Sequence, residues 1–128
     1  LLLMGEWSEM ETLFQKGLFE YENGDYFEAH EAWEDLWSDY HFLDRKFIQG
    51  LIQLAVSFVH LENGNMIGAR SLLKKCENKF SDYNGIHRNI NINELKSAIE
   101  AVGIVYEDMK NISEFDWDLV PNLKGEYD

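Results

Sequence analysis

A junction between helices that occurs twice constrains this chain more than any other feature of its sequence. The segment Glu22-Asn23-Gly24, followed by Ala29, recurs forty residues later as Glu62-Asn63-Gly64, followed by Ala69. Asn-Gly is typical of a helix end, because glycine adopts the left-handed backbone conformation at little steric cost. The alanine that follows lets the next helix approach its partner closely. The repeat therefore predicts two stacked helical hairpins.

Helix-start signals place about five helices along the chain. Ser8 with Glu11, and Asp25 with Glu28, have the capping-box spacing, so each pair is expected to open a helix. Further helices are expected over residues 44–63, 65–80 and 92–110, a loop with the turn Asn84-Gly85 over 81–90, and an extended tail over 111–128. Two hairpin copies are too few for a solenoid. We therefore predict an all-α fold, with one domain over residues 1–128 that forms a compact bundle of two hairpins and a C-terminal helix.

Charge and hydropathy argue against several classes of partner. Twenty-four acidic and eleven basic residues give a net charge of −13, which opposes binding to nucleic acid or to an anionic membrane because such binding depends on Lys and Arg. The longest apolar stretch, residues 47–61, contains Gln49, Gln53 and His60 and is shorter than the ~20 residues that span a bilayer. One cysteine, Cys76, and no recognisable signal peptide favour a cytoplasmic protein.

An apolar face of the second helix carries two groups that ionise. At about 100° per residue, six residues share about a third of the circumference: Tyr26, Phe27, His30, Trp33, Glu34 and Trp37. Because four of the six are aromatic, we expect this face to be buried, with Glu28 and Asp35 opposite it. A carboxylate on a buried face needs a partner, a bound ion or a raised pKa.

The third helix repeats this pattern. Four residues share one face at spacings of four, three and four: Gln49, Gln53, Val56 and His60. An antiparallel arrangement of the two helices would place Gln53 near His30. It would place Gln49 near Glu34, with His60 about 10 Å further along at about 1.5 Å per residue. Together the two helices predict a polar cluster inside the bundle.

Two interpretations of this cluster stay open. A histidine and a carboxylate four residues apart can hold one divalent cation, and residues 30–34 are similar to the zinc-protease motif H-E-x-x-H with Glu34 in place of the second histidine. Alternatively, the same side chains satisfy one another in a hydrogen-bond network that fixes the register of the helices. Arg45, near the turn, could pair with Glu34 or cap the polar cluster against solvent, but a surface ion pair with Asp44 or Asp39 is the stronger expectation.

The motifs also resemble a known family. The segments 24–37 and 47–55, then His60, Gly64-Asn65 and Gly68-Ala69, are similar to the family called domain of unknown function 309, over about residues 14–80. The resemblance implies a small all-helical bundle from bacteria, archaea or plastid-bearing organisms, hence a cytoplasmic or stromal protein. Members are often labelled predicted metal-dependent hydrolases. The motif positions of the family correspond here to His30, Glu31, Trp33, Glu34, Trp37, Gln49, Gln53 and His60.

These observations lead to two main hypotheses of function, and whether the chain is an enzyme stays open. The first is a domain that binds a divalent metal or a small molecule. Its metal ligands would be His30, Glu34 and His60, and its small-molecule contacts Trp33, Trp37, Gln49 and Gln53. In the hydrolase form of this hypothesis, a bound cation activates water, and Glu31 or Glu34 accepts the proton.

The second hypothesis is a non-enzymatic scaffold or interaction module, in which the polar cluster only specifies packing. A third option is a homo-oligomer whose subunits meet through exposed aromatic residues such as Trp7 and Trp117.

Overall fold

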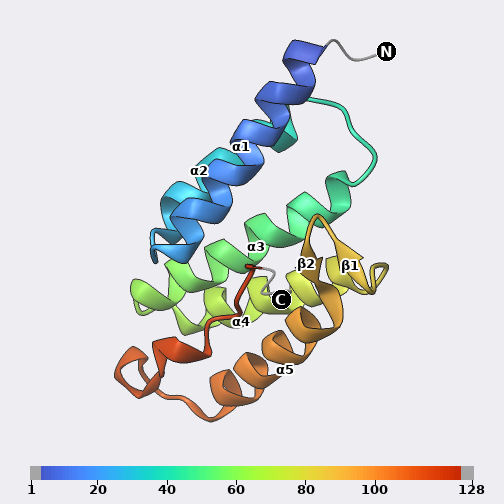
Figure 1. Ribbon diagram of the computed structural model, residues 1–128. Coiled ribbons are helices and arrows are strands. Elements are labelled where there is room, and N and C mark those ends of the chain that lie inside the picture. Colours follow the sequence, from blue (N-terminus) through green and yellow to red (C-terminus); the bar gives the residue numbers. More distant parts are fainter. Residues whose placement is uncertain (1–3, 125–128) are drawn as a thin grey trace.

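The computed structural model describes residues 4–124 and shows a bundle of helices (Figure 1). Five α-helices follow one another along the chain: α1 (Met4–Glu22), α2 (Tyr26–Asp39), α3 (Arg45–Glu62), α4 (Met66–Phe80) and α5 (Ile92–Asp108). A small sheet of β1 (Ile86–His87) and β2 (Ile90–Asn91) precedes α5, and two 3-10 helices, η1 (Ile112–Glu114) and η2 (Trp117–Leu119), follow it. The predicted all-α fold is confirmed.

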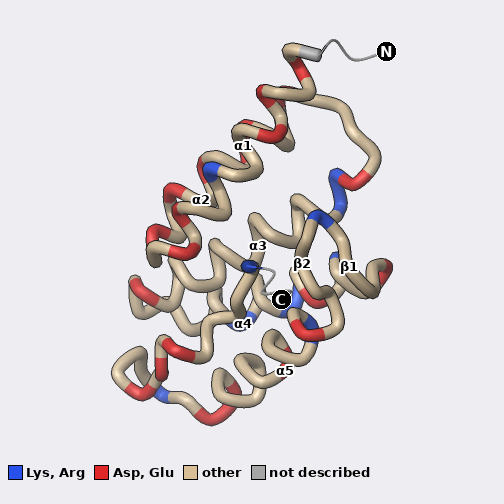
Figure 2. Tube along the Cα trace, in the orientation of Figure 1, with Lys and Arg blue, Asp and Glu red and all other residues tan. Residues whose placement is uncertain are grey.

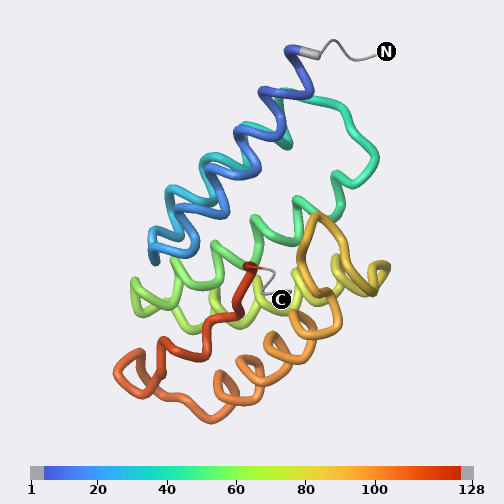
Figure 3. The backbone as a smooth tube through the Cα atoms, in the orientation of Figure 1, coloured from blue at the N-terminus to red at the C-terminus, as the bar shows by residue number. Residues whose placement is uncertain are grey.

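Two helical hairpins, α1–α2 and α3–α4, follow each other along the chain trace (Figure 3). Their turns are the same: Gly24 has φ of 79° and Gly64 has φ of 75°. Asp25 N donates to Glu20 O over 2.9 Å in the first turn, as Asn65 N donates to His60 O over 2.8 Å in the second. The repeated Asn-Gly junction therefore produces the repeated turn that the sequence predicted.

Neither predicted capping box forms at a helix start. The first helix already runs at Met4, upstream of Ser8, and the side chain of Asp25 makes no capping hydrogen bond to α2. A capping box requires the backbone N–H of the cap residue to be free for the acidic side chain three residues later. Here that N–H of Asp25 is bound to Glu20 O, so Glu28 has no donor to accept from.

Small residues set how closely the helices pack. Ala29 and Ala69, the repeated alanines, are fully buried. In α1, a Cβ added to Gly17 would lie 2.0 Å from Trp33 Nε1, so glycine is required where the indole of α2 crosses α1. That indole is fully buried, and its Nε1 donates to Phe14 O over 3.1 Å.

The segment after α4 is more ordered than the predicted loop. Strands β1 and β2 pair antiparallel, and the turn between them places Arg88 and Asn89 at φ of 49° and 62°, as in a type I′ hairpin turn. Two-residue strands are too short to show an alternating pattern in the sequence.

Residues 111–124 of the predicted extended tail contain η1 and η2 and fold back onto the bundle (Figure 1). The last four residues of the predicted tail, 125–128, lie outside the described residues. Phe115 and Leu123 are buried, and the hydroxyl of Tyr21 donates to Pro121 O over 2.8 Å. The tail thus completes the core next to the first hairpin.

Acidic residues are concentrated on α1, α2 and α5, whereas α3 and α4 carry one each, Glu62 and Glu77 (Figure 2). Within residues 4–124, no helix is both long enough and apolar enough to cross a membrane.

Candidate functional site

The buried face of α2 differs from the predicted one. Its buried residues are Tyr26, Ala29, Ala32, Trp33 and Leu36. The predicted face of aromatic and ionisable residues was therefore wrong for four of its six members, and Phe27 is 54 % exposed. The buried face is instead centred on Ala29, Ala32 and Leu36. At about 100° per residue it is rotated away from His30, Glu34 and Trp37, which therefore lie at its margin.

His30 and Glu34 lie on this margin rather than in the core. The side chain of His30 is 25 % exposed and that of Glu34 is 44 % exposed. Their closest atoms, Nε2 of His30 and Oε2 of Glu34, are 3.9 Å apart, and His30 Nδ1 lies 4.0 Å from Oε1 of Glu31. Both separations exceed hydrogen-bond length. The three side chains are therefore neighbours that are not bonded to one another.

The polar face of α3 lies at a similar margin. Its four predicted members, Gln49, Gln53, Val56 and His60, are all half-buried. The positions between them are buried except Val59. The predicted sharing of one face is therefore confirmed, but this face borders the core instead of lying within it.

A contact between Trp37 and Arg45 joins the two margins at one end. Nη2 of Arg45 donates to Trp37 O over 2.6 Å, and Cζ of Arg45 lies 4.1 Å from the centre of the Trp37 ring. Trp37 lies two turns along α2 from His30, and Gln49 and Gln53 lie one and two turns along α3 from Arg45. We call these residues the polar edge: His30, Glu34 and Trp37 of α2, with Arg45, Gln49 and Gln53 of α3.

The predicted surface ion pair of Arg45 was wrong. Its guanidinium instead covers the Trp37 ring, while Asp44 accepts hydrogen bonds from His87 (2.8 Å) and from Nη2 of Arg88 (2.8 Å). Residues forty-odd positions apart carry no spacing signal in a sequence, so these partners could not be predicted.

Four polar atoms of the polar edge are buried and unpaired. In residues 4–124, the buried side-chain nitrogen and oxygen atoms without a hydrogen-bond partner are Nδ1 of His30, Nε1 of Trp37, Nε of Arg45 and Oε1 of Gln53. All four belong to the polar edge. A buried polar group left unpaired costs about 1 to 3 kcal/mol. The predicted closed network is therefore absent among the described side chains.

His60 lies with the second turn instead of with His30. Its Nδ1 is 3.2 Å from Nδ2 of Asn65, and a Cβ added to Gly68 would lie 2.8 Å from its ring. Asn65 also caps α4, because its side chain accepts from Gly68 N over 2.9 Å. His60 thus packs on the junction between α3 and α4.

The described residues do not form a ready metal site. Among residues 4–124, no group of three or more His, Cys, Asp or Glu side chains is placed to hold an ion. Two ligands about 2.1 Å from a tetrahedral ion lie roughly 3.4 Å apart, whereas the closest atoms of His30 and Glu34 are 3.9 Å apart. The metal set of His30, Glu34 and His60 stays a prediction that this geometry does not favour.

The fold and the site together define a class of protein: a small bundle of helical hairpins with an unsatisfied polar edge between α2 and α3. Residues 14–72 match the family model described as Domain of unknown function (DUF309). This segment of the chain therefore belongs to that family, which confirms the resemblance seen in the motifs. The matched residues, 14–72, include every residue of the polar edge. Neither a curated protein nor a solved structure matches the chain.

Proposed function

We propose that this domain is a ligand-binding module and that the polar edge is its binding site. One observation supports the proposal: among residues 4–124, all four buried side-chain atoms that lack a hydrogen-bond partner belong to residues of the polar edge. Unpaired buried groups destabilise a fold, and where they persist they are typical of sites that serve a function. A ligand that paired with these groups would recover the free energy that the unliganded protein forgoes.

The donors and acceptors of the polar edge indicate the chemistry of the ligand. Nε1 of Trp37 and Nε of Arg45 are donors, and Oε1 of Gln53 is an acceptor. A primary amide offers the complementary acceptor and donors in one group, and a carboxylate fits the donor end next to the Arg45 charge. Because these atoms have almost no surface exposed to solvent, binding requires side chains of the polar edge to move aside.

A hydrolase based on a metal has weaker support. It would use His30 and Glu34 as ligands and Glu31 as the base, but no group of three or more ligating side chains is placed to hold an ion within residues 4–124. We therefore expect hydrogen bonds, and not a bound ion, to hold the ligand.

Nuclear magnetic resonance of the indole N–H groups tests the proposal. Acetamide and acetate serve as probes for an amide and a carboxylate. We expect the Trp37 resonance to shift until it saturates, and to respond less in Gln53→Leu when acetamide is the probe. The Trp33 indole is an internal control, because its N–H is already bound to Phe14 O.

An unchanged Trp37 resonance with both probes would overturn the proposal, and so would equal shifts of Trp37 and Trp33. Titration with Zn²⁺ covers the other hypothesis. Stoichiometric Zn²⁺ binding that is lost in His30→Ala, with no response to either probe, would support a metal site in place of ours.

A further inference from the structure

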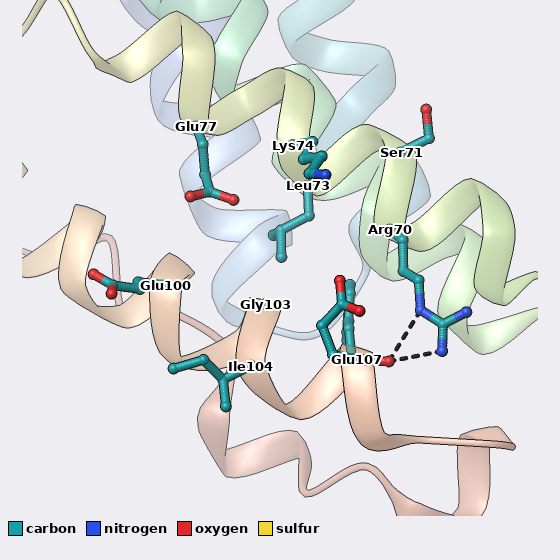
Figure 4. A pocket seen from close by; sticks show the side chains of 10 residues that line it. Arg70, Ser71, Leu73, Lys74, Glu77, Glu100, Gly103, Ile104 and Glu107 are labelled. Carbon is teal, nitrogen blue, oxygen red and sulfur yellow. Dashed lines mark hydrogen bonds between the residues drawn. The ribbon is translucent and has the colours of Figure 1, made fainter.

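A groove of about 390 Å³ lies between α4 and α5, on elements that carry none of the polar edge (Figure 4). The groove is lined by residues 70–77 of α4 and 100–107 of α5 that lie one or two helical turns apart. Leu73 points from α4 toward Gly103, and Ile104 lies on α5 beside it. The middle of the groove is therefore apolar.

Five charged side chains surround this apolar middle. Arg70 and Lys74 carry positive charge, and Glu77, Glu100 and Glu107 carry negative charge. Among residues 4–124, none of the five takes part in an ion pair. Two cations and three carboxylates leave the groove with one excess negative charge. A ligand with one net positive charge would balance it.

Arg70 forms a fixed end of the groove. Its Nε and Nη2 donate to Tyr106 O over 3.0 and 2.7 Å, and Nη2 also donates to Met109 O over 2.9 Å. These bonds hold the guanidinium at the end of α5 and leave its two Nη1 donors without a partner among them. Glu107 points toward α4 between Leu73 and Arg70 (Figure 4). An anion and a cation could therefore be held side by side at this end.

The opposite end holds two carboxylates that repel each other. Glu77 extends from α4 toward α5, on the side where Glu100 lies (Figure 4). Burial and the negative charge of Glu100 raise the pKa of Glu77 above its usual value, and Lys74 only partly offsets them. A cationic group placed between these carboxylates would relieve the repulsion.

We propose that this groove binds a free basic amino acid, L-lysine or L-arginine. The side-chain cation lies between Glu77 and Glu100, and the aliphatic stem lies on Leu73 and Ile104. The α-ammonium group pairs with Glu107, and the α-carboxylate accepts from Arg70. Glu100 and Glu107 are seven residues apart on one face of α5, which is about 10 Å at 1.5 Å per residue, so the two ends can be reached only by an extended ligand.

Isothermal titration calorimetry on the full chain tests this site. L-lysine and L-arginine are the probes, and L-norleucine is the control ligand because it has a similar aliphatic stem without the cation. We expect one molecule of either basic amino acid to bind per chain, and L-norleucine to bind at least tenfold more weakly. No heat of binding with the basic amino acids at millimolar concentrations would overturn the proposal, as would equal binding of L-norleucine.

Three variants locate the site. Glu77→Gln combined with Glu100→Gln should weaken binding at least tenfold, and it removes a repulsion, so it should fold. Gly103→Leu fills the middle of the groove and should abolish binding. If the leucine prevents folding, Gly103→Ala takes its place, because the added Cβ would lie 3.6 Å from Leu73, an ordinary contact distance. This variant should fold and weaken binding measurably.

Glu28→Gln is the matched control, because it removes one exposed carboxylate from α2 and should leave the affinity unchanged. Equal affinity of the Glu77→Gln, Glu100→Gln variant and the wild type would overturn the proposal. Because no residue of the polar edge lines this groove, the His30→Ala variant should bind L-lysine with the affinity of the wild type. Failure of the function proposed for the polar edge would therefore leave this test unaffected.

Discussion

At the scale of single residues, the stability of the fold depends on positions where helices pack very closely, such as Gly17 against Trp33. It also depends on the unpaired buried atoms of the polar edge. The ring of Trp33 is fully buried, and its N–H donates a hydrogen bond to Phe14 O. Trp37, one turn later on the same helix, has a buried N–H with no hydrogen-bond partner among residues 4–124. The sequence assigned both residues to a ligand pocket, and the structure separates them into one core residue and one edge residue.

Gly17 offers a sharp test of this packing. A Cβ at this position would lie 2.0 Å from Trp33 Nε1, so Gly17→Ala should displace the indole and lower the free energy of unfolding by about 1 to 3 kcal/mol, as overpacking does. Thermal unfolding followed by circular dichroism measures it. The matched control is Gly5→Ala in the same helix, where nothing lies within 4 Å of the added Cβ. It should leave the melting temperature unchanged or slightly higher. Equal effects of the two changes would contradict the packing described for Trp33.

At the scale of elements, the repeated Asn-Gly turn made the two hairpins predictable, because its conformational requirement is local. The short β1–β2 hairpin and the partners of Asp44 were not predictable, since they depend on residues far apart in the chain. The polar edge was predicted in part: all its residues except Arg45 were named from helical spacing, but their burial was overestimated. Spacing alone shows which residues share a face and not how deeply a neighbouring helix covers it.

The β1–β2 hairpin is held to the start of α3 by Asp44. Burial alone would raise the pKa of this carboxyl group, but hydrogen bonds from Arg88 and His87 outweigh it and hold the pKa below its usual value. A carboxyl group with a lowered pKa in the folded state contributes stability above its unfolded pKa and loses it as the pH falls through the folded value. The contribution should thus be complete at neutral pH and fade below about 3.8.

Asp44→Asn should therefore lower the free energy of unfolding by about 2 kcal/mol at pH 7, the usual scale for losing hydrogen bonds to a charged group. The loss should shrink in acid below the usual pKa of the carboxyl group. Urea denaturation at pH 7, and again at a pH below the usual pKa of the carboxyl group, measures both effects. Asp35→Asn, an exposed carboxylate on α2, is the control and should change little. A loss that stays constant across this pH range would mean that the Asp44 charge is not what holds the hairpin.

At the scale of the whole molecule, negative charge dominates. The net charge is −13, and such an excess destabilises a compact state through self-repulsion. The same excess is consistent with a cationic or neutral ligand at the groove between α4 and α5. It makes the helices depend on apolar packing and on close contacts through small residues.

Salt should therefore stabilise the fold. Raising the ionic strength from about 0.01 M to about 0.15 M shortens the Debye length from about 30 Å to about 8 Å, which screens most of the repulsion between distant surface carboxylates. We expect the melting temperature to rise over this range in sodium chloride, as measured by differential scanning calorimetry. A fall would show that attractive ion pairs outweigh the net repulsion.

The central claim is that the polar edge carries unpaired buried groups that weaken the unliganded fold. Comparing the thermal stability of Gln53→Leu with that of the wild type tests it most directly, because leucine replaces the unpaired oxygen by an apolar group of similar size. The matched control is Gln49→Leu, one turn away on the same face and without a buried unpaired atom in residues 4–124. We predict that Gln53→Leu raises the free energy of unfolding by about 1 kcal/mol or more and that Gln49→Leu changes it less. A lower stability in Gln53→Leu would contradict the account, because it would show that the Gln53 side chain is satisfied within the fold.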